Sequence, residues 1–211
     1  MDNYIGIDLG TSALKALLVR EDGEIIAKAS VPYDCSHPHK YWSEQDPSLW
    51  LSACKQAIRD LIAVSENHEV RAIGIAGQMH GLVALDKDNN VIRNAILWND
   101  QRTGEECAEI IETAGGIDGL VSYTNNSMLT GFTGGKILWV KKNEPENYKK
   151  IVKFFMTKDY IRYCLTGAIA TDVSDASGTG FFDVEKRDWS YELIEKVGLD
   201  KNIFPDVYES D

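Results

Sequence analysis

The stretch that decides the fold is residues 4–12, Tyr4-Ile5-Gly6-Ile7-Asp8-Leu9-Gly10-Thr11-Ser12. Its apolar part is typical of a buried strand, and Gly10 begins a turn in which the backbone can come close to a ligand. The N–H groups of this turn and the hydroxyls of Thr11 and Ser12 can hold phosphate oxygens. Asp8 can hold Mg²⁺, directly or through water, because oxygen ligands suit that ion. A structural interpretation is equally good: the strand ends in a capped turn, and Asp8 is an Asx-turn residue.

The neighbouring segments extend this strand into a sheet. Residues 13–19 and 25–31 predict two more strands, joined by a turn at Asp22-Gly23, so that the three form an antiparallel meander. A polar loop over residues 32–45 follows. Asp46 then suits a helix N-cap and Pro47 the first helical position. The helix predicted there has one apolar stripe made of Trp50, Ala53, Cys54, Ala57, Ile58, Leu61 and Ile62.

The rest of the chain alternates between strands and helices. A strand is predicted over 70–76, and residues 82–85 and 91–92 flank a turn at 86–90. Short strands are predicted over 95–98 and 151–155, and helices over 101–113, 133–143 and 157–165. This order predicts an α/β protein with a mixed sheet, and the density of helices after residue 100 indicates an inserted subregion.

Composition excludes several classes of function. The net charge of −11 leaves no broad basic surface for nucleic acid and makes an anionic membrane a poor partner. The four cysteines form no C-x-x-C pair, so neither a zinc site nor a disulfide framework is predicted. No apolar run is long enough to span a bilayer, and no signal peptide is recognisable. We therefore expect a reduced, cytoplasmic protein.

A second group of candidate residues lies after the 70–76 strand, in Gly77-Gln78-Met79-His80-Gly81. Gln78 and His80 lie on one side of an extended segment, and the glycines around them allow close approach of the backbone. An amide and an imidazole can pair with the hydroxyls of a polyol. Taken by itself, His80 is more simply explained as a buried histidine at a strand bend.

A third group is Trp98-Asn99-Asp100, at the end of the 95–98 strand. Trp98 can form an apolar wall for the carbon face of a sugar, while Asn99 and Asp100 bond to its hydroxyls. The alternative is that Asn99 or Asp100 caps a helix that begins near Gln101. Capping does not explain a tryptophan at the end of a strand.

Other polar segments carry weaker signals. Turn and capping chemistry explains most of residues 171–178. His37 and His39 are expected to be exposed loop residues, because no carboxylate or cysteine lies at ligand spacing. Gly134-Gly135-Lys136-Ile137 lacks the hydroxyl residue that a phosphate-binding P-loop has after its lysine.

Together these segments resemble the FGGY family of carbohydrate kinases. The resemblance rests on residues 4–12 as the first phosphate-binding motif of the actin, heat-shock ATPase and sugar kinase superfamily, together with residues 74–81 and 96–100. Residues 131–140 are similar to the first signature of the family, and residues 42–47, 158–160 and 172–178 fit as well. The match runs through the whole chain in order. The segments Gln78–Gly81 and Trp98–Asp100 are more similar to xylulose kinases than to glycerol or gluconate kinases.

The resemblance implies a ribonuclease-H-like lobe of the actin-like ATPase superfamily, with a mixed sheet and helical insertions. It implies ATP and Mg²⁺ as cofactors and a small sugar as substrate, most simply D-xylulose converted to D-xylulose 5-phosphate. Asp8 would help to position Mg²⁺ and the transferred phosphate, and Thr11 and Ser12 would belong to the phosphate loop. Met79 and His80 would contact the sugar, with Gln78 close by. Whether the protein forms a homodimer is left open.

Part of the family pattern is missing from residues 1–211. Members of the family are considerably longer, and their general base is an aspartate in a Gly-Asp-Asn motif that residues 1–211 do not contain. We therefore expect residues 1–211 to be the sugar-binding lobe of the kinase, without the nucleotide-binding lobe and inactive alone. Two alternatives remain: a non-catalytic sugar-binding module, and an actin-like or chaperone-like ATPase with a protein ligand. The second alternative gives no reason for the Gln78–Gly81 and Trp98–Asp100 segments.

Overall fold

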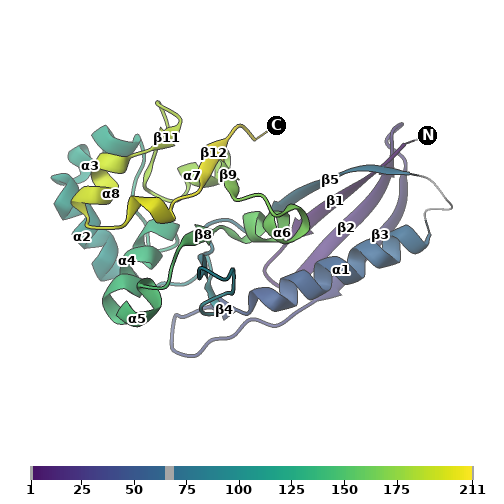
Figure 1. Ribbon diagram of the computed structural model, residues 1–211, viewed down its shortest axis with the longest axis horizontal. Coiled ribbons are helices and arrows are strands. Elements are labelled where there is room, and N and C mark those ends of the chain that lie inside the picture. The colour runs from purple at the N-terminus through teal and green to yellow at the C-terminus, as the bar shows by residue number, and fades with distance from the viewer. Residues whose placement is uncertain (1, 65–68, 211) are drawn as a thin grey trace.

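The computed structural model describes residues 2–64 and 69–210 and shows two regions side by side (Figure 1). One region holds a four-stranded sheet with a long helix against it. In the other region the shorter helices gather around a second hydrophobic core. The two regions meet where the strands of the sheet end, so segments that are distant in the sequence come together there.

The four-stranded sheet has the order β3-β2-β1-β5. It consists of β1 (Asn3–Leu9), β2 (Ala13–Arg20), β3 (Ile25–Pro32) and β5 (Val70–Gly77). Strand β2 is antiparallel to both β1 and β3, whereas β5 is parallel to β1. In β1, Ile5, Ile7 and Leu9 are buried on one face while Asp8 is exposed on the other, as the two-residue period of a strand requires. The predicted meander and mixed sheet are confirmed.

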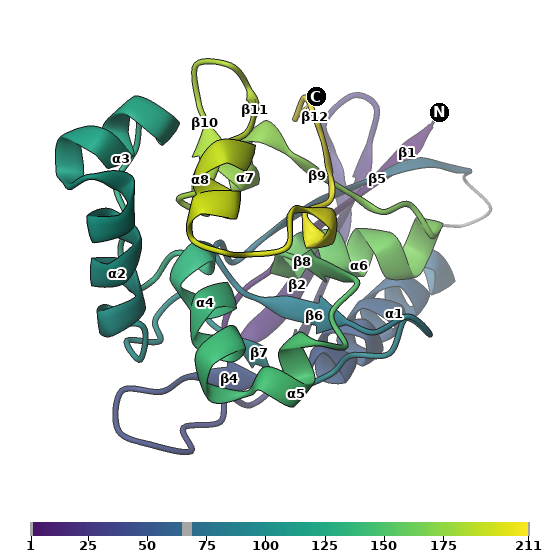
Figure 2. The same cartoon turned by 60° about the vertical axis from the view of Figure 1, so that its left-hand side comes forward.

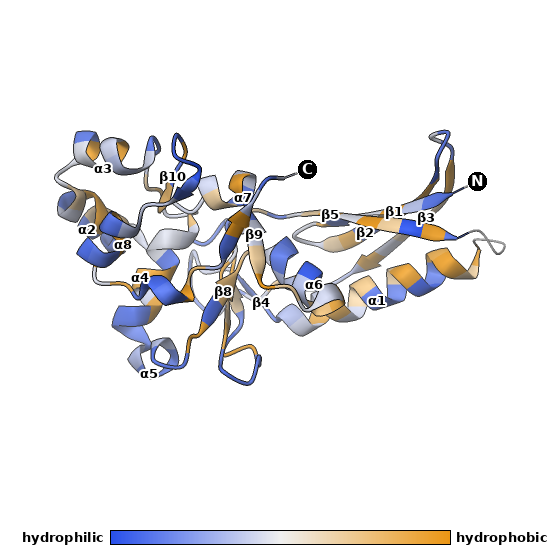
Figure 3. Cartoon of the chain, turned by 45° about the horizontal axis from the view of Figure 1, so that its top comes forward, coloured by the Kyte–Doolittle hydropathy of each residue, from blue (hydrophilic) through white to orange (hydrophobic). Residues whose placement is uncertain are grey.

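Helix α1 (Pro47–Ala63) covers the buried face of this sheet. Its N-cap is Asp46, whose carboxylate accepts a hydrogen bond from the Ser48 N–H at 2.8 Å, and Pro47 opens the first turn as predicted. In Figure 3 its ribbon alternates between hydrophobic and hydrophilic residues, as an amphipathic helix should. The predicted apolar stripe is correct except at its edge, because Ile62 is 51% exposed.

The second region is built from short elements around one hydrophobic core. Its helices are α2 (Gly104–Ala114), α3 (Ile117–Thr124), α4 (Thr133–Asn143), α5 (Pro145–Tyr148), α7 (Val173–Ser177), α8 (Tyr191–Lys196) and the 3₁₀ turn η1 (Lys201–Ile203). Two-residue and three-residue strands complete it: β9 (Ala170–Asp172) with β12 (Asp206–Tyr208), and β10 (Phe182–Asp183) with β11 (Asp188–Trp189). Phe154, Trp189 and Phe204 pack edge to face at its centre.

Two small ladders connect the regions. Strand β6 (Val83–Leu85) pairs with β8 (Lys153–Phe155), and Figure 2 shows this ladder between α4 and α6 (Thr157–Thr166). Strand β4 (Glu44–Gln45) pairs with β7 (Ala95–Ile96). Side chains of alternate residues on β6 enter different cores, since Val83 and Leu85 join the sheet region and Ala84 the helical region.

The element predictions differ from the structure mainly at boundaries. The predicted helix over 133–143 matches α4, and the one over 157–165 matches α6 to within one residue. The helix predicted over 101–113 begins only at Gly104. Residues 91–92 form a single bridge to Leu85 rather than a strand. In the part of the chain that the structure describes, no helix is long and apolar enough to cross a membrane.

Candidate active site

The first site segment is the turn between β1 and β2. Asp8 lies on the open face of the sheet, beside a hollow of about 570 Å³ that Gly6, Lys15 and Ala76 also line. Within residues 2–64 and 69–210 the structure records no hydrogen bond or ion pair for the Asp8 carboxylate. The carboxylate is therefore free to accept a metal ion or a water molecule bound to one, which is the donor chemistry that Mg²⁺ prefers.

The backbone of this turn is partly occupied and partly open. The Gly10 N–H donates to the Ala13 carbonyl at 3.1 Å, and the Gly10 carbonyl accepts from the Tyr33 hydroxyl at 2.6 Å. Burial, together with the nearby negative charge of Asp8, raises the pKa of Tyr33. Among the described residues, the N–H groups of Thr11 and Ser12 have no partner. The turn therefore offers a phosphate the two hydroxyl residues and their amides, while the Gly10 amide serves the turn itself.

Thr11 joins the turn after β1 to Trp98 directly and to the Gln78 segment through Gln45. Its side-chain oxygen accepts a hydrogen bond from the Trp98 indole N–H at 3.0 Å. Its carbonyl accepts from the Gln45 amide at 2.7 Å. The Trp98 ring is 43% exposed, so it keeps a free face while its polar edge is fixed to the turn. The structure thus places the predicted sugar wall directly against the predicted phosphate turn.

Gln45 joins the Gln78 segment to the same turn. Its side-chain oxygen accepts from the Gln78 amide at 3.0 Å and from the Trp50 indole at 3.0 Å. The Gln78 N–H donates to the carbonyl of Leu9 at 2.7 Å, and the Gln78 carbonyl accepts from the Thr157 hydroxyl. Among residues 2–64 and 69–210, the buried side-chain oxygen of Gln78 has no partner. A buried acceptor of this kind ordinarily has a donor, so it is available to a ligand hydroxyl.

His80 is held in an unusual conformation. Its φ is 60°, in the left-handed region that residues other than glycine seldom adopt. The centre of its ring lies 4.8 Å from that of Phe132. The ring also packs so closely against Gly178 that a Cβ added to Gly178 would lie 2.3 Å from the imidazole. Burial, and next to it the charge of Lys136, lowers the pKa of His80 to about 4. The imidazole is therefore neutral at physiological pH. Met79, beside it, is 52% exposed.

Asp100 lies deeper than its two neighbours. It is fully buried, and its carboxylate accepts hydrogen bonds from the Ser43 N–H at 2.7 Å and from the Arg102 guanidinium at 2.7 and 2.9 Å. The structure does not bring this carboxylate to the surface with Trp98. Asn99 does line a surface hollow, of about 490 Å³, and its side-chain oxygen is buried without a partner. Neither residue caps α2, whose N-cap is Thr103, so the capping alternative is wrong.

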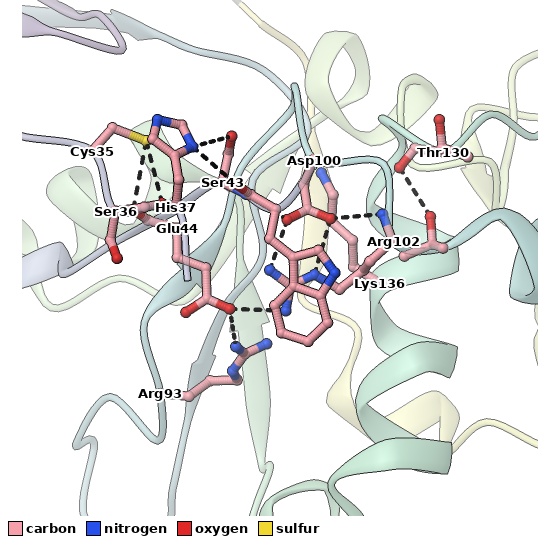
Figure 4. Close-up of polar contacts among 12 residues, drawn as sticks. Cys35, Ser36, His37, Ser43, Glu44, Arg93, Asp100, Arg102, Thr130 and Lys136 are labelled. Atoms are coloured by element: carbon pink, nitrogen blue, oxygen red, sulfur yellow. Dashed lines mark hydrogen bonds and ion pairs between the residues drawn. The ribbon is translucent and has the colours of Figure 1, made fainter. Parts of the chain in front are cut away.

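Asp100 belongs to a network of charged side chains that includes Glu44, Arg93 and Arg102 (Figure 4). Glu44 forms ion pairs with Arg93 at 2.5 Å and with Arg102 at 2.8 Å. Arg102 also lies over the rings of Trp42 and Trp139, at 3.6 and 4.8 Å. Gln45, Glu44 and Arg102 support the site but were not predicted to do so, although residues 42–47 carried part of the family resemblance. Their spacing along the chain gives no sign of these contacts.

The segment 171–178 carries capping chemistry, as predicted. The Asp172 carboxylate accepts from the N–H groups of Ser174 and Asp175 at 2.9 and 3.1 Å. Asp159, Asp172 and Asp175 converge, and the ammonium of Lys158 forms an ion pair with each of them. A cation of the chain thus already occupies the centre of this acidic cluster.

His37 and His39 are exposed, as expected, and His37 Nδ1 lies 2.9 Å from the carbonyl of Trp42.

The chain is similar to known proteins over its whole length. Residues 3–211 match the model of the FGGY family of carbohydrate kinases, N-terminal domain. The chain belongs to this family. Relatives of this FGGY chain include the xylulose kinases of Staphylococcus xylosus, 43% identical over 210 residues, and of Escherichia coli K12, 44% identical over 206 residues. These alignments cover 100% and 98% of the chain but only 43% and 42% of the relatives, so the chain spans about two fifths of their length.

Solved structures of the family have the same fold. A "xyloylose kinase" from Brucella ovis superposes with a TM-score of 0.92 at 41% identity, covering 98% of this chain and 43% of its own. A gluconate kinase from Lactobacillus acidophilus gives a TM-score of 0.91 at 28% identity, covering 98% and 42%. These neighbours confirm the predicted family and the actin-like ATPase fold. The roles of individual site residues remain predictions.

Proposed function

We propose that this FGGY chain is the sugar-binding part of an ATP-dependent ketopentose kinase. The full-length protein would convert D-xylulose and MgATP to D-xylulose 5-phosphate and ADP. The contact between the Trp98 indole and the Thr11 hydroxyl carries the proposal, because it joins an exposed aromatic wall to a turn with open N–H donors. A kinase needs these two features side by side, so that a hydroxyl of the sugar meets the transferred phosphoryl group.

Partnerless polar atoms near Trp98 support a polyol as the ligand. In the part of the chain that the structure describes, the side-chain oxygens of Gln78 and Asn99 are buried acceptors without donors. Sugar hydroxyls are donors and acceptors at once and can satisfy both. Neutral His80 and exposed Met79 would complete the sugar site. We propose that Asp100 acts through its neighbours, since its oxygens already bind Ser43 and Arg102 and fix the segment that carries Trp98 and Asn99.

Asp8 is the residue we propose to hold Mg²⁺, directly or through a bound water. Its carboxylate is exposed at the end of β1, and the described residues offer it no competing partner. The metal would neutralise charge on the phosphates of ATP. Thr11 and Ser12 would hold phosphate oxygens through their N–H and hydroxyl groups. The names of the relatives favour xylulose as the sugar, and the whole reaction is proposed for the longer protein.

Calorimetric titration of the chain with D-xylulose tests the proposal. Binding without nucleotide is expected, because the sugar segments lie within the described residues. A coupled ADP-release assay run beside it should show no turnover if residues 1–211 lack the base and the nucleotide half. Turnover would show that the chain is a complete kinase. A folded chain that binds no ketopentose would contradict the sugar-binding role.

Substitution of Asp8 separates the metal role from sugar binding. In the full-length protein, Asp8→Asn should lower kcat on the order of a hundredfold while KM for D-xylulose stays nearly constant, because the lost interaction forms with the transferred phosphoryl group. Steady-state kinetics at saturating MgATP measures both constants. Lys28→Ala, an exposed lysine on the outer strand β3 of the same sheet, is the control. An equal effect of Asp8→Asn on kcat and on sugar affinity would argue against the metal role.

A further inference from the structure

Lys136 is a buried lysine with an unusual set of partners. It lies in the first turn of α4 and has no exposed surface. Its ammonium group donates hydrogen bonds to two backbone carbonyls, those of His80 and of Gly131, the latter at 2.7 Å. Within residues 2–64 and 69–210 it forms no ion pair. A lysine buried in this way ordinarily has a carboxylate partner, so its position calls for an explanation.

Both carbonyls belong to segments of the proposed sugar site. His80 has the left-handed backbone conformation, with a φ of 60°. Gly131 lies so close to Trp98 that a Cβ on it would come within 2.7 Å of the Trp98 carbonyl. One side chain therefore connects the His80 segment to the backbone that supports Trp98. The hydrogen bond from Lys136 also holds the His80 carbonyl in place, and so supports the strained backbone conformation of His80.

Burial of this lysine is costly for the fold. It lowers the pKa of Lys136 to about 7, an effect that Asp100 opposes and Arg102 reinforces through their charges. Figure 4 shows these two residues near Lys136. A methionine of similar length would fill the space without the cost of removing an amine from water. Residues that lower the stability of the fold are expected at sites where function requires them.

We infer that Lys136 is a positioning residue, which holds the His80 and Trp98 segments in their sugar-binding arrangement before the sugar arrives. The inference rests on the proposed function, since it names what prepares that same site. A loop that is ordered in advance loses less conformational entropy when a ligand binds, so its affinity is higher at the same set of contacts. Lys136 touches no sugar in this account and acts through the carbonyls of His80 and Gly131.

The variant Lys136→Met tests the inference beside a matched control. Lys153 also donates to two carbonyls, those of Asn202 at 2.7 Å and Phe204 at 2.9 Å, and is outside the proposed site. Calorimetric titration with D-xylulose should show a dissociation constant about tenfold higher for Lys136→Met and nearly unchanged for Lys153→Met. The hydrogen-bonded amides on either side of this segment are those of Gln78 and Leu82, which donate to the carbonyls of Leu9 and Ile96. Hydrogen exchange at these two amides should be faster in Lys136→Met only.

The outcomes separate this inference from the proposed function. Equal sugar affinity and equal exchange at the Gln78 and Leu82 amides in Lys136→Met and the unmutated chain would overturn the positioning role. If the unmutated chain binds no ketopentose, the proposed function fails, and the exchange data alone decide whether Lys136 holds the segment. If Lys136→Met does not fold, the exchange of the unmutated chain is the deciding measurement. Its Gln78 and Leu82 amides must then exchange slowly without sugar, and fast exchange contradicts an arrangement held in advance.

Discussion

At the scale of single residues, His80 combines features that are each unfavourable for folding. It has a positive φ without being glycine, its ring leaves no room for a Cβ on Gly178, and burial lowers the pKa of its imidazole to about 4. Such strain is retained where surrounding contacts fix it, and it is concentrated at functional sites. The two interpretations that the sequence left open for His80 are compatible, since a half-buried histidine at a bend can also face a ligand.

The pKa of His80 gives a prediction about stability. In the folded chain it is lowered to about 4, whereas an unfolded histidine titrates near 6.5. Between these values the unfolded state binds the proton and the folded state does not, so the free energy of unfolding rises with pH across this window. We expect the difference in unfolding free energy between the unmutated chain and His80→Asn to shrink as pH falls from 6.5 to 4. Urea titrations at several pH values measure it.

The same urea titrations on His39→Asn provide the control. His39 is exposed in the loop before β4. A difference for His80→Asn that stays constant with pH would show that the imidazole titrates normally in the folded chain. It would also remove the argument that His80 meets the sugar as a neutral ring.

At the scale of elements, the site depends on the contact between the end of β7 and the turn after β1. Trp98 and Thr11 are far apart in the sequence, and one hydrogen bond of 3.0 Å joins them. Trp98→Phe keeps an aromatic wall and removes the donor, and Thr11→Val removes the acceptor. A double-mutant cycle on sugar affinity should give a coupling energy of about 1 kcal/mol. Additive effects of the two substitutions would show that the contact does not hold the sugar wall.

Elements with strong local signals could be predicted from the sequence, and those fixed by packing could not. The cap and apolar stripe of α1 predict that helix from its local sequence. Helix α4 was also predicted correctly, although it is buried on all sides from Thr133 to Val140 and so has no apolar stripe. Helix α2 begins three residues later than expected at Gly104, because the Asp100 carboxylate pairs with Arg102 instead of starting a helix. Short elements such as α7 and β10 have too few residues for a periodic pattern, so only their tertiary contacts define them.

The residues of the candidate site likewise divide into those with a local sequence signal and those placed by tertiary contacts. Sequence patterns identified the segments around Asp8, Gln78 and Trp98, because glycines and polar residues at strand ends mark them. The supporting residues Gln45 and Lys136 could not be found in this way. Their roles come from hydrogen bonds to the backbone of distant segments, which leave no pattern in the local sequence.

At the scale of the whole molecule, a buried polar network lies where the two hydrophobic cores meet. Glu44 is on β4, which pairs with β7 in one of the two ladders that connect the regions, while Arg102 packs on Trp139 of α4. Asp100 completes the network, and the side chains of both Asp100 and Arg102 are almost inaccessible. Buried charges of this kind must be paired to be tolerated, so the network constrains how the two regions meet.

This arrangement predicts a large effect of Asp100→Ala on stability. The substitution leaves the guanidinium of Arg102 buried beside Glu44 alone and the Ser43 N–H without its acceptor. Removing one partner of a buried pair costs about 3–5 kcal/mol of unfolding free energy, which urea denaturation can measure. Asp88→Ala, at an exposed ion pair with Lys87, should cost less than about 1 kcal/mol and is the control. If Asp100→Ala were no more destabilising than this control and weakened sugar binding instead, Asp100 would contact the sugar directly, and the network would not be what fixes the two regions.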